Sequence, residues 1–159
     1  MYLFLLYADD LKIFLSIDSL HSCAQLQDDL RRLYLWSVDN KLALNVKKCK
    51  TLTFSIGLSY YHYQYGIEST VLERALEHKD LGVVFDSKFK FSSHVAYISL
   101  RANMGLGFVI RSSKDFKSTT ALKILYYSYV RSILEYASVV WNLKFQYNIN
   151  ILEMIQKSF

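Results

Sequence analysis

The stretch YLFLLYADDLKIFLSI, residues 2–17, decides how the chain begins to fold. Residues 2–7 form a continuous apolar run, which is typical of a strand that is buried on both faces. Residues 11–17 place Leu or Ile at every second position, which is strand periodicity. Asp9 and Asp10 lie between the two runs, and aspartate favours turns because its carboxylate can accept hydrogen bonds from nearby backbone amides. The stretch therefore predicts a β-hairpin with two carboxylates at its tip.

A helix and several strands are expected to follow the hairpin. Apolar side chains recur at spacings of three and four from Cys23 to Leu33, which predicts an amphipathic helix. Asp18 or Ser19 is suited to cap its start, and Asn40 is suited to end it. Alternating, β-branched and aromatic residues then predict a meander of strands at 51–56, 60–67 and 81–85, with a turn at 57–59.

The remainder of the chain has helical periodicity. Ser92 or Ser93 is suited to cap a helix whose apolar face holds Val95, Ile98, Ala102, Leu106 and Val109. Gly105 and Gly107 are expected to weaken this helix by about 1 kcal/mol each relative to alanine. Ser118 is suited to cap a longer helix with Leu122, Leu125, Tyr126, Tyr129, Ile133 and Ala137 on one face, and a third helix is expected at 149–159. The order of elements predicts an α+β domain with a helical appendage.

Composition excludes several classes of protein. With 159 residues, of which 52% are hydrophobic and 21% charged, the chain suits one ordinary domain and not a disordered tail. Two cysteines are too few for a disulfide framework, and no apolar run approaches the roughly 18 residues that a membrane helix needs. The amino terminus also lacks the basic flank of a signal peptide. We therefore expect an intracellular protein that is neither secreted nor inserted in a membrane.

Charge is unevenly distributed along the chain. The net charge is −3 over residues 1–40 and +8 over residues 41–159. This distribution suits a metal site beside a groove that binds a polyanion, or a solvated surface on which the two signs happen to separate.

The adjacent carboxylates of Asp9 and Asp10 carry the clearest chemical signal. Mg²⁺ takes oxygen ligands and keeps several waters, so two carboxylates at a turn suit it. Phosphoryl transfer with two metal ions needs such carboxylates to hold the ions that activate a hydroxyl and neutralise the leaving group. An Asp-Asp pair at a turn is also common as a solvated turn, so the surrounding sequence has to decide.

Motifs along the whole chain favour a metal site over a solvated turn. They are YADD (7–10), LRRL (30–33) with WS (36–37) and NKL (40–42), LNVKKCK (44–50) with TF (53–54), HKDLGVVFD (78–86), LEYAS (134–138) with Trp141, and LEMIQK (152–157). In this order they resemble the carboxy-terminal part of the reverse transcriptase of a non-LTR (LINE-type) retrotransposon. YADD is similar to the palm hairpin called motif C, residues 44–54 to motif D, and residues 134–157 to helices of the thumb region.

The resemblance implies a fold, a metal and a set of partners. Residues 1–90 would be a partial polymerase palm made of β-hairpin, helix and β-meander, and residues 91–159 a helical thumb-like region. Asp9 would be the main ligand of Mg²⁺ (or Mn²⁺) and Asp10 a supporting carboxylate. Tyr7 and Ala8 would lie against the primer end and the incoming nucleotide. The partners implied are an RNA template, a DNA primer and deoxynucleoside triphosphates.

Basic residues are the second part of the expected site. By resemblance, Lys47 or Lys48 would sit near the triphosphate and protonate pyrophosphate, and the sequence does not choose between them; the physical case for lysine is its flexible ammonium group. A solvated basic loop at 41–50 is the alternative. Further contacts with nucleic-acid phosphates are expected from Lys41, Lys50, Lys88, Lys90, Arg101, Arg111, Lys114 and Lys117.

The departure from the family limits the expected activity. A reverse transcriptase also uses a carboxylate on a neighbouring palm strand, the motif B segment and basic fingers, all of which would precede Tyr2. Asp18 cannot replace that carboxylate, since an extended strand would carry it roughly 25 Å from Asp10. We therefore expect a fragment that lacks the amino-terminal half of the polymerase and is inactive alone. Two alternatives are a non-catalytic nucleic-acid-binding module and the inert product of a decayed element.

Other reactive residues have plainer interpretations. His21, His62, His78 and His94 show no metal-ligand spacing. Cys23 is expected in the core, while the lysines around Cys49 would lower the pKa of its thiol without making it a nucleophile. The tyrosines at 60, 61, 63 and 65 fit either sheet packing or stacking on bases, and packing is favoured.

Overall fold

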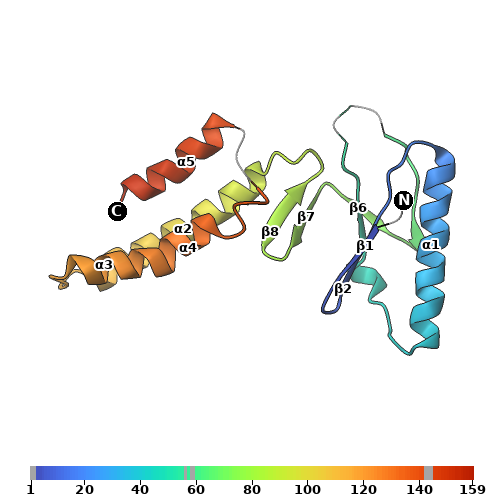
Figure 1. Ribbon diagram of the computed structural model, residues 1–159, viewed down its shortest axis with the longest axis horizontal. Helices are drawn as coiled ribbons and strands as arrows, with labels where there is room; N and C mark the ends of the chain where they lie inside the picture. Colours follow the sequence, from blue (N-terminus) through green and yellow to red (C-terminus); the bar gives the residue numbers. More distant parts are fainter. Residues whose placement is uncertain (1–2, 56, 58–59, 142–144) are drawn as a thin grey trace. The chain divides into compact units, whose positions relative to one another are not determined.

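The computed structural model describes residues 3–55, 57, 60–141 and 145–159, and it is a mixed α+β protein. Its contacts divide the chain into two compact units, Met1–Ala75 and Leu76–Phe159. Figure 1 shows a hairpin, a long helix and short strands in the first unit, and a second hairpin followed by helices in the other. The strand pair at residues 77–86 belongs to the second unit, with the helices.

The predicted amino-terminal hairpin is confirmed. Strand β1 (Leu3–Tyr7) pairs antiparallel with β2 (Asp10–Phe14), and Tyr7 lies opposite Asp10. The prediction that residues 2–7 are buried on both faces is wrong, because every residue of β1 is exposed, from 50% for Leu3 to 71% for Phe4. The physical reason is that β1 and β2 form a two-stranded sheet, which no other described strand extends.

Helix α1 (Leu20–Asp39) follows the pattern read from the sequence. Ser19 is its N-cap, and the Ser19 hydroxyl accepts a hydrogen bond from the Ser22 amide at 3.2 Å. Asn40 ends the helix, as expected. The buried thiol of Cys23 packs in a core with Tyr65, Ile67 and Leu72, so the expectation of a core role for Cys23 is confirmed.

The predicted meander is wrong. Strand β3 (Lys50–Leu52) pairs in parallel with β6 (Glu73–Ala75), while β4 (Gly66–Ile67) and β5 (Thr70–Val71) form a separate antiparallel pair. Residues 60–65 form no strand, although they are rich in tyrosine. Instead, the Tyr61 hydroxyl donates to the Asp18 carbonyl, the Tyr63 carbonyl accepts from Arg74, and the Tyr65 side chain packs in the core. Such tertiary contacts outweigh a preference for strand. The expected turn at 57–59 and the end of the strand at 51–56 fall partly on residues 56, 58 and 59, outside the described residues.

The second unit opens with a hairpin that was only half expected. Strands β7 (Glu77–Asp80) and β8 (Val83–Asp86) pair antiparallel around a two-residue turn. Leu81 and Gly82 form this turn with φ angles of 43° and 87°, so the strand predicted at 81–85 begins two residues late. β7 gave no signal because its four residues are polar or charged and show no apolar alternation.

Helix α2 (Ser92–Ser112) confirms its predicted apolar face, since Val95, Ile98, Ala102, Leu106 and Val109 are all buried. The predicted cap is wrong: the N-cap is Phe91, and Ser92 and Ser93 lie inside the helix. Phe91 has a φ of 56°, and its amide donates to Asp86 Oδ2 at 2.7 Å. Backbone amides of this turn lower the pKa of Asp86, although burial alone would raise it. The Asp86 carboxylate thus fixes the start of α2.

The long helix predicted after Ser118 is interrupted. Ser118 caps α3 (Thr119–Tyr126) as expected, but a π-helical segment, η2 (Tyr127–Arg131), precedes α4 (Ser132–Glu135). Hydrogen bonds that reach one residue further than in an α-helix widen the turn and rotate the apolar face, so Val130 and Leu134 are buried whereas Tyr129, predicted to be inside, is exposed. Helix α5 (Gln146–Lys157) buries Ile155 against this core. None of the described helices is long and apolar enough to cross a lipid bilayer.

Candidate functional site

The tip of the first hairpin presents the two predicted carboxylates together. Ala8 and Asp9 form the connection, and Asp10 is the first residue of β2. Ala8 has a φ of 49°, a left-handed conformation that costs a side-chain-bearing residue about 1–2 kcal/mol. Tyr7, Ala8, Asp9 and Asp10 are all exposed. Pairing of the apolar runs on either side therefore holds both carboxylates at one open end.

The carboxylates fit part of a magnesium site. Asp9 and Asp10 supply the hard oxygen ligands that Mg²⁺ prefers, and their exposure leaves room for its waters. Within the described residues no three His, Cys, Asp or Glu side chains come together. Asp18 serves a different purpose, because the Ser22 and Ser19 hydroxyls donate to its carboxylate at the start of α1 and lower its pKa.

The motif D lysines lie on a short 3₁₀ segment, η1 (Val46–Lys48). Val46 and Cys49 pack on the core of the first unit, and Lys47 and Lys48 between them are exposed. Among the described side chains, neither lysine forms a hydrogen bond or an ion pair with Asp9 or Asp10. The geometry therefore leaves the choice between the two lysines open.

The expected phosphate contacts divide between the two units. In the first unit Lys41 is exposed, while Lys50 forms an ion pair with Glu73 at 3.1 Å. The remaining six are exposed in the second unit, in the turn after β8, on α2 and between α2 and α3; they are Lys88, Lys90, Arg101, Arg111, Lys114 and Lys117. The charge of Lys50 is therefore compensated by Glu73.

A basic and aromatic cluster in the second unit was missed by the sequence reading. Lys79 on β7 donates to the Tyr97 hydroxyl at 2.7 Å, and its ammonium lies 4.3 Å from the centre of the Tyr97 ring. Arg101, one helical turn further along α2, donates to the same hydroxyl at 3.2 Å. The hydrogen bonds from Lys79 and Arg101 lower the pKa of Tyr97. The spacing of Tyr97 and Arg101 was visible in the sequence, but the arrival of Lys79 from an unpredicted strand was not.

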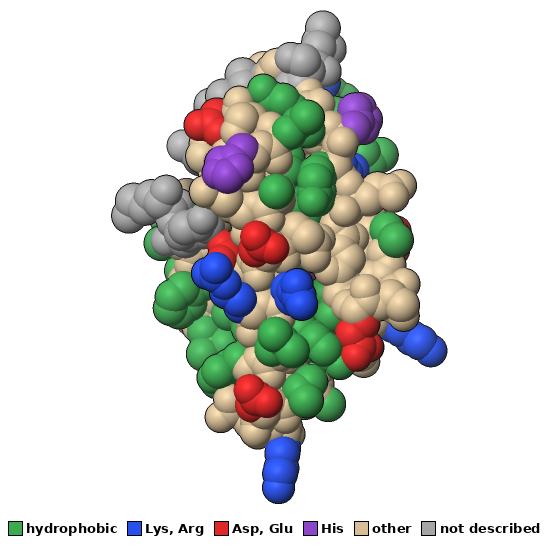
Figure 2. All heavy atoms as spheres, turned by 90° about the vertical axis from the view of Figure 1, so that its right-hand side faces the viewer, with side chains coloured by type: hydrophobic (Ala, Val, Ile, Leu, Met, Phe, Trp, Pro, Cys, Tyr) green, Lys and Arg blue, Asp and Glu red, His purple; other side chains and the backbone are tan. Residues whose placement is uncertain are grey.

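On the face seen in Figure 2, the described side chains form no charge patch of one sign. Acidic and basic side chains are interspersed there with hydrophobic and neutral ones.

The cysteines and tyrosines are partly as expected. Burial raises the pKa of the Cys49 thiol, so the expectation that nearby lysines lower it is wrong. The half-buried thiol points to the Asn45 carbonyl at 3.4 Å.

Tyr65 is buried and packs with Tyr63, whose ring centre lies 5.0 Å away. Tyr60 and Tyr61 are exposed. Tyr65 and Tyr63 therefore pack in the core, but not within a sheet as expected, because residues 60–65 form no strand.

His94 is the histidine that the structure sets apart. It is fully buried in the second unit, its Nδ1 accepts from the Val84 amide at 3.3 Å, and its Nε2 has no hydrogen-bond partner among the described atoms. Burial, with a contribution from Lys79, lowers the pKa of His94. The ring packs edge to face with Trp141 at 5.2 Å, so His94 is a neutral core residue.

Comparison with known proteins finds no matching family model, no matching curated protein and no matching solved structure.

Proposed function

We propose that this chain is part of an RNA-directed DNA polymerase of the non-LTR retrotransposon type, and that Asp9 and Asp10 hold its catalytic metal. The single observation that supports this most is the tight hairpin, which places two adjacent exposed carboxylates after Tyr7 and Ala8. This is the local geometry that the YADD motif requires. The motif's order with residues 44–54 and 78–86 along the chain supports the same proposal.

The residues have distinct roles under this proposal. Asp9 and Asp10 would bind Mg²⁺ or Mn²⁺, which neutralises charge on a nucleoside triphosphate when it is bound. Tyr7 would offer its exposed ring to the primer end, and Ala8 would keep the tip narrow because its side chain is a single methyl group. Lys47 or Lys48 would donate a proton to pyrophosphate from the exposed η1 segment.

Titration with Mn²⁺, followed by NMR, tests the metal site. Paramagnetic Mn²⁺ should broaden the amide signals of residues 7–11 first, because the ion would sit on the two carboxylates. The double variant Asp9→Asn/Asp10→Asn should abolish this broadening. The matched control is Asp28→Asn/Asp29→Asn, which removes an adjacent pair from α1 and should leave the broadening unchanged. Equal broadening at both pairs in the unaltered chain would contradict the proposal.

A second candidate function is nucleic-acid binding without catalysis. The cluster of Lys79, Tyr97 and Arg101 favours it, because two cations from different elements converge on one exposed position. A phosphate oxygen next to the Tyr97 hydroxyl would be within reach of both. Guanidinium and ammonium groups are the usual donors to such oxygens.

Salt dependence of binding to a primer–template duplex tests this candidate. Affinity should fall steeply as salt rises, because bound phosphates release their counterions. The plot of log K against log salt has a negative slope. The variant Lys79→Gln/Arg101→Gln should make this slope shallower by about 1–2 units. Lys157→Gln, which removes a lysine already paired with Glu153 at 2.9 Å, is the control and should leave the slope unchanged. Affinity that does not respond to salt would rule the candidate out.

A further inference from the structure

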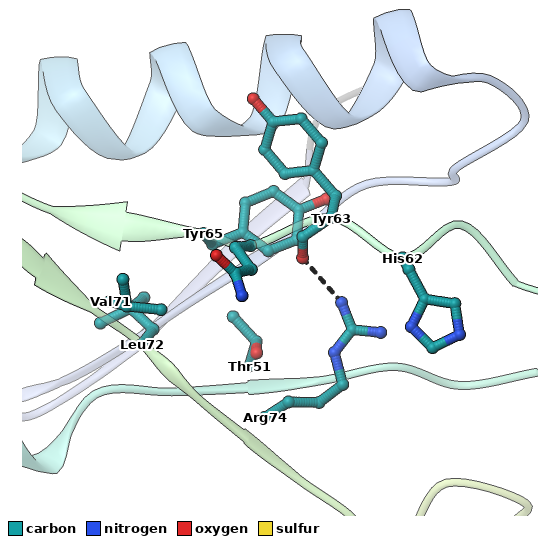
Figure 3. A pocket seen from close by; sticks show the side chains of 8 residues that line it. Thr51, His62, Tyr63, Tyr65, Val71, Leu72 and Arg74 are labelled. Atoms are coloured by element: carbon teal, nitrogen blue, oxygen red, sulfur yellow. Dashed lines mark hydrogen bonds between the residues drawn. The ribbon is translucent and has the colours of Figure 1, made fainter.

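The first unit contains a pocket beside the parallel strands β3 and β6, with a volume of about 510 Å³. Pockets for small ligands commonly measure roughly 300–1,000 Å³, so this one can hold a molecule of nucleotide size. Figure 3 shows its lining, in which Thr51 from β3 and Arg74 from β6 face the segment His62–Tyr65. None of these residues belongs to the hairpin of Asp9 and Asp10.

Arg74 has unused hydrogen-bonding capacity in this pocket. Its Nη2 donates to the Tyr63 carbonyl at 2.8 Å, as the dashed line in Figure 3 marks. Its Nη1 is buried and has no hydrogen-bond partner in the described part of the chain. Glu73, the neighbouring acid, is engaged by Lys50 at 3.1 Å. A buried donor without an acceptor is costly, and a guanidinium satisfies this need best with a carboxylate or phosphate oxygen.

One aromatic ring lies next to the guanidinium, and a second ring lies beside the first. The Arg74 Cζ lies 5.2 Å from the centre of the Tyr60 ring, and Tyr60 in turn lies 4.6 Å from His62. His62 and Tyr63 line the pocket; the His62 side chain is exposed, whereas the half-buried Tyr63 side chain packs on the core of the first unit. Such rings offer flat faces to a planar ligand, and stacking of a base on one is worth about 1–3 kcal/mol.

Polar groups complete the lining at the edge of the rings. Gln64 contributes a side-chain amide that can both donate and accept, and Thr51 contributes a hydroxyl. A ligand that matches the whole lining has an anionic oxygen for Arg74, a flat face for the rings, and ring heteroatoms for the amide and hydroxyl. A phosphate joined to a nucleobase has all three.

We propose that this pocket binds one nucleotide unit, with its phosphate on Arg74 and its base against His62. The pocket shares no lining residue with the hairpin of Asp9 and Asp10 or with the cluster of Lys79, Tyr97 and Arg101. It would hold either a free nucleotide or one residue of a single-stranded nucleic acid, since both present the same phosphate and base. Binding would give the half-buried Arg74 side chain an anionic partner and would cover the exposed side chain of His62.

Titration of the full chain with deoxythymidine monophosphate, followed by NMR, tests the proposal. Signals of Thr51, His62 and Arg74 should shift, and inorganic phosphate should bind about tenfold more weakly because it has no base to stack. Arg74→Gln should weaken binding of the nucleotide at least about tenfold, the usual effect of removing a charged hydrogen-bond donor. Arg32→Gln is the matched control, because Arg32 is an exposed arginine of α1 in the same unit, and it should change nothing.

Two further variants keep the test decisive if Arg74→Gln fails to fold. His62→Ala alters an exposed side chain and should weaken the nucleotide several-fold without changing the affinity for inorganic phosphate. Arg74→Lys keeps the positive charge and should retain more nucleotide binding than Arg74→Gln. Absence of shifts at the pocket, or equal nucleotide affinity of the unaltered chain and His62→Ala, would overturn the proposal.

An oligonucleotide arm separates the two sources of the ligand. A short oligothymidylate that shifts the same pocket signals at lower concentration than the monophosphate identifies a strand residue as the ligand. Stronger binding of deoxythymidine triphosphate than of the oligonucleotide identifies a free nucleotide. Both results support the pocket, and neither depends on Asp9, Asp10, Lys79 or Arg101, so failure here is distinguishable from failure of the proposed function.

Discussion

Gly105→Ala should lower the free energy of unfolding of the second unit by about 2 kcal/mol, although alanine is the better helix former. A Cβ at Gly105 would lie 2.5 Å from the backbone oxygen of Tyr129, in the π-helical segment η2. That oxygen is part of the backbone and cannot rotate away as the end of a long side chain can. The substitution would therefore push α2 and η2 apart, and overpacking of this kind costs about 1–3 kcal/mol.

Gly107→Ala is the matched control in the same helix. A Cβ there would lie 3.1 Å from Arg111 Nη1, the end of a flexible side chain that can move. This variant should gain about 0.5–1 kcal/mol from helix propensity. Denaturation followed by Trp141 fluorescence in a Trp36→Phe background reports on the second unit alone. A stabilising effect of both alanines would show that α2 and η2 do not approach as described.

Trp141→Ala should lower the free energy of unfolding of the second unit by about 3–5 kcal/mol, the usual result of truncating a buried tryptophan. Trp141 is only 3% exposed and packs with Val83, Phe91 and Ile98. Its Nε1 donates to the Tyr136 carbonyl at 2.8 Å, and its ring lies against His94. The substitution would leave a cavity and an unpaired carbonyl, and would open His94 to water.

Trp36→Ala is the control for this variant. Trp36 lies on α1 with 54% of its surface exposed, so its loss should change the stability of the first unit by about 0.5 kcal/mol or less. Denaturant unfolding monitored through the amide NMR signals of α2 and α1 measures each unit separately. Similar effects of the two substitutions would mean that Trp141 is not part of the core.

Local patterns predicted the elements that depend on local chemistry. The hairpin around Asp9, the cap at Ser19 and the five buried positions of α2 follow from turn preference, capping and a period of 3.6 residues. The adjacency of Asp9 and Asp10 at an exposed tip was predictable for the same reason, because the hairpin alone determines it.

Elements that depend on distant partners were not predictable in this way. β3 pairs in parallel with β6 across twenty residues of chain, and β7 has no apolar alternation that would mark it as a strand. The π-helical segment moves Val130 inward and Tyr129 outward, which no α-helical period anticipates. The pocket at Arg74 and the meeting of Lys79 with Tyr97 arise from these pairings, so they too were invisible in the sequence.

The exposed strand β1 sets two processes against each other during folding. Its five residues are uncharged, its outer edge is not paired with another described strand, and its side chains are exposed. Folding of one chain proceeds at a rate independent of concentration, whereas pairing of two such edges is a second-order process. Dilution therefore favours folded monomer, and crowding of newly made chains favours association through this edge. A strand bound to this edge, or a charged substitution at Leu5, would prevent two chains from pairing through β1.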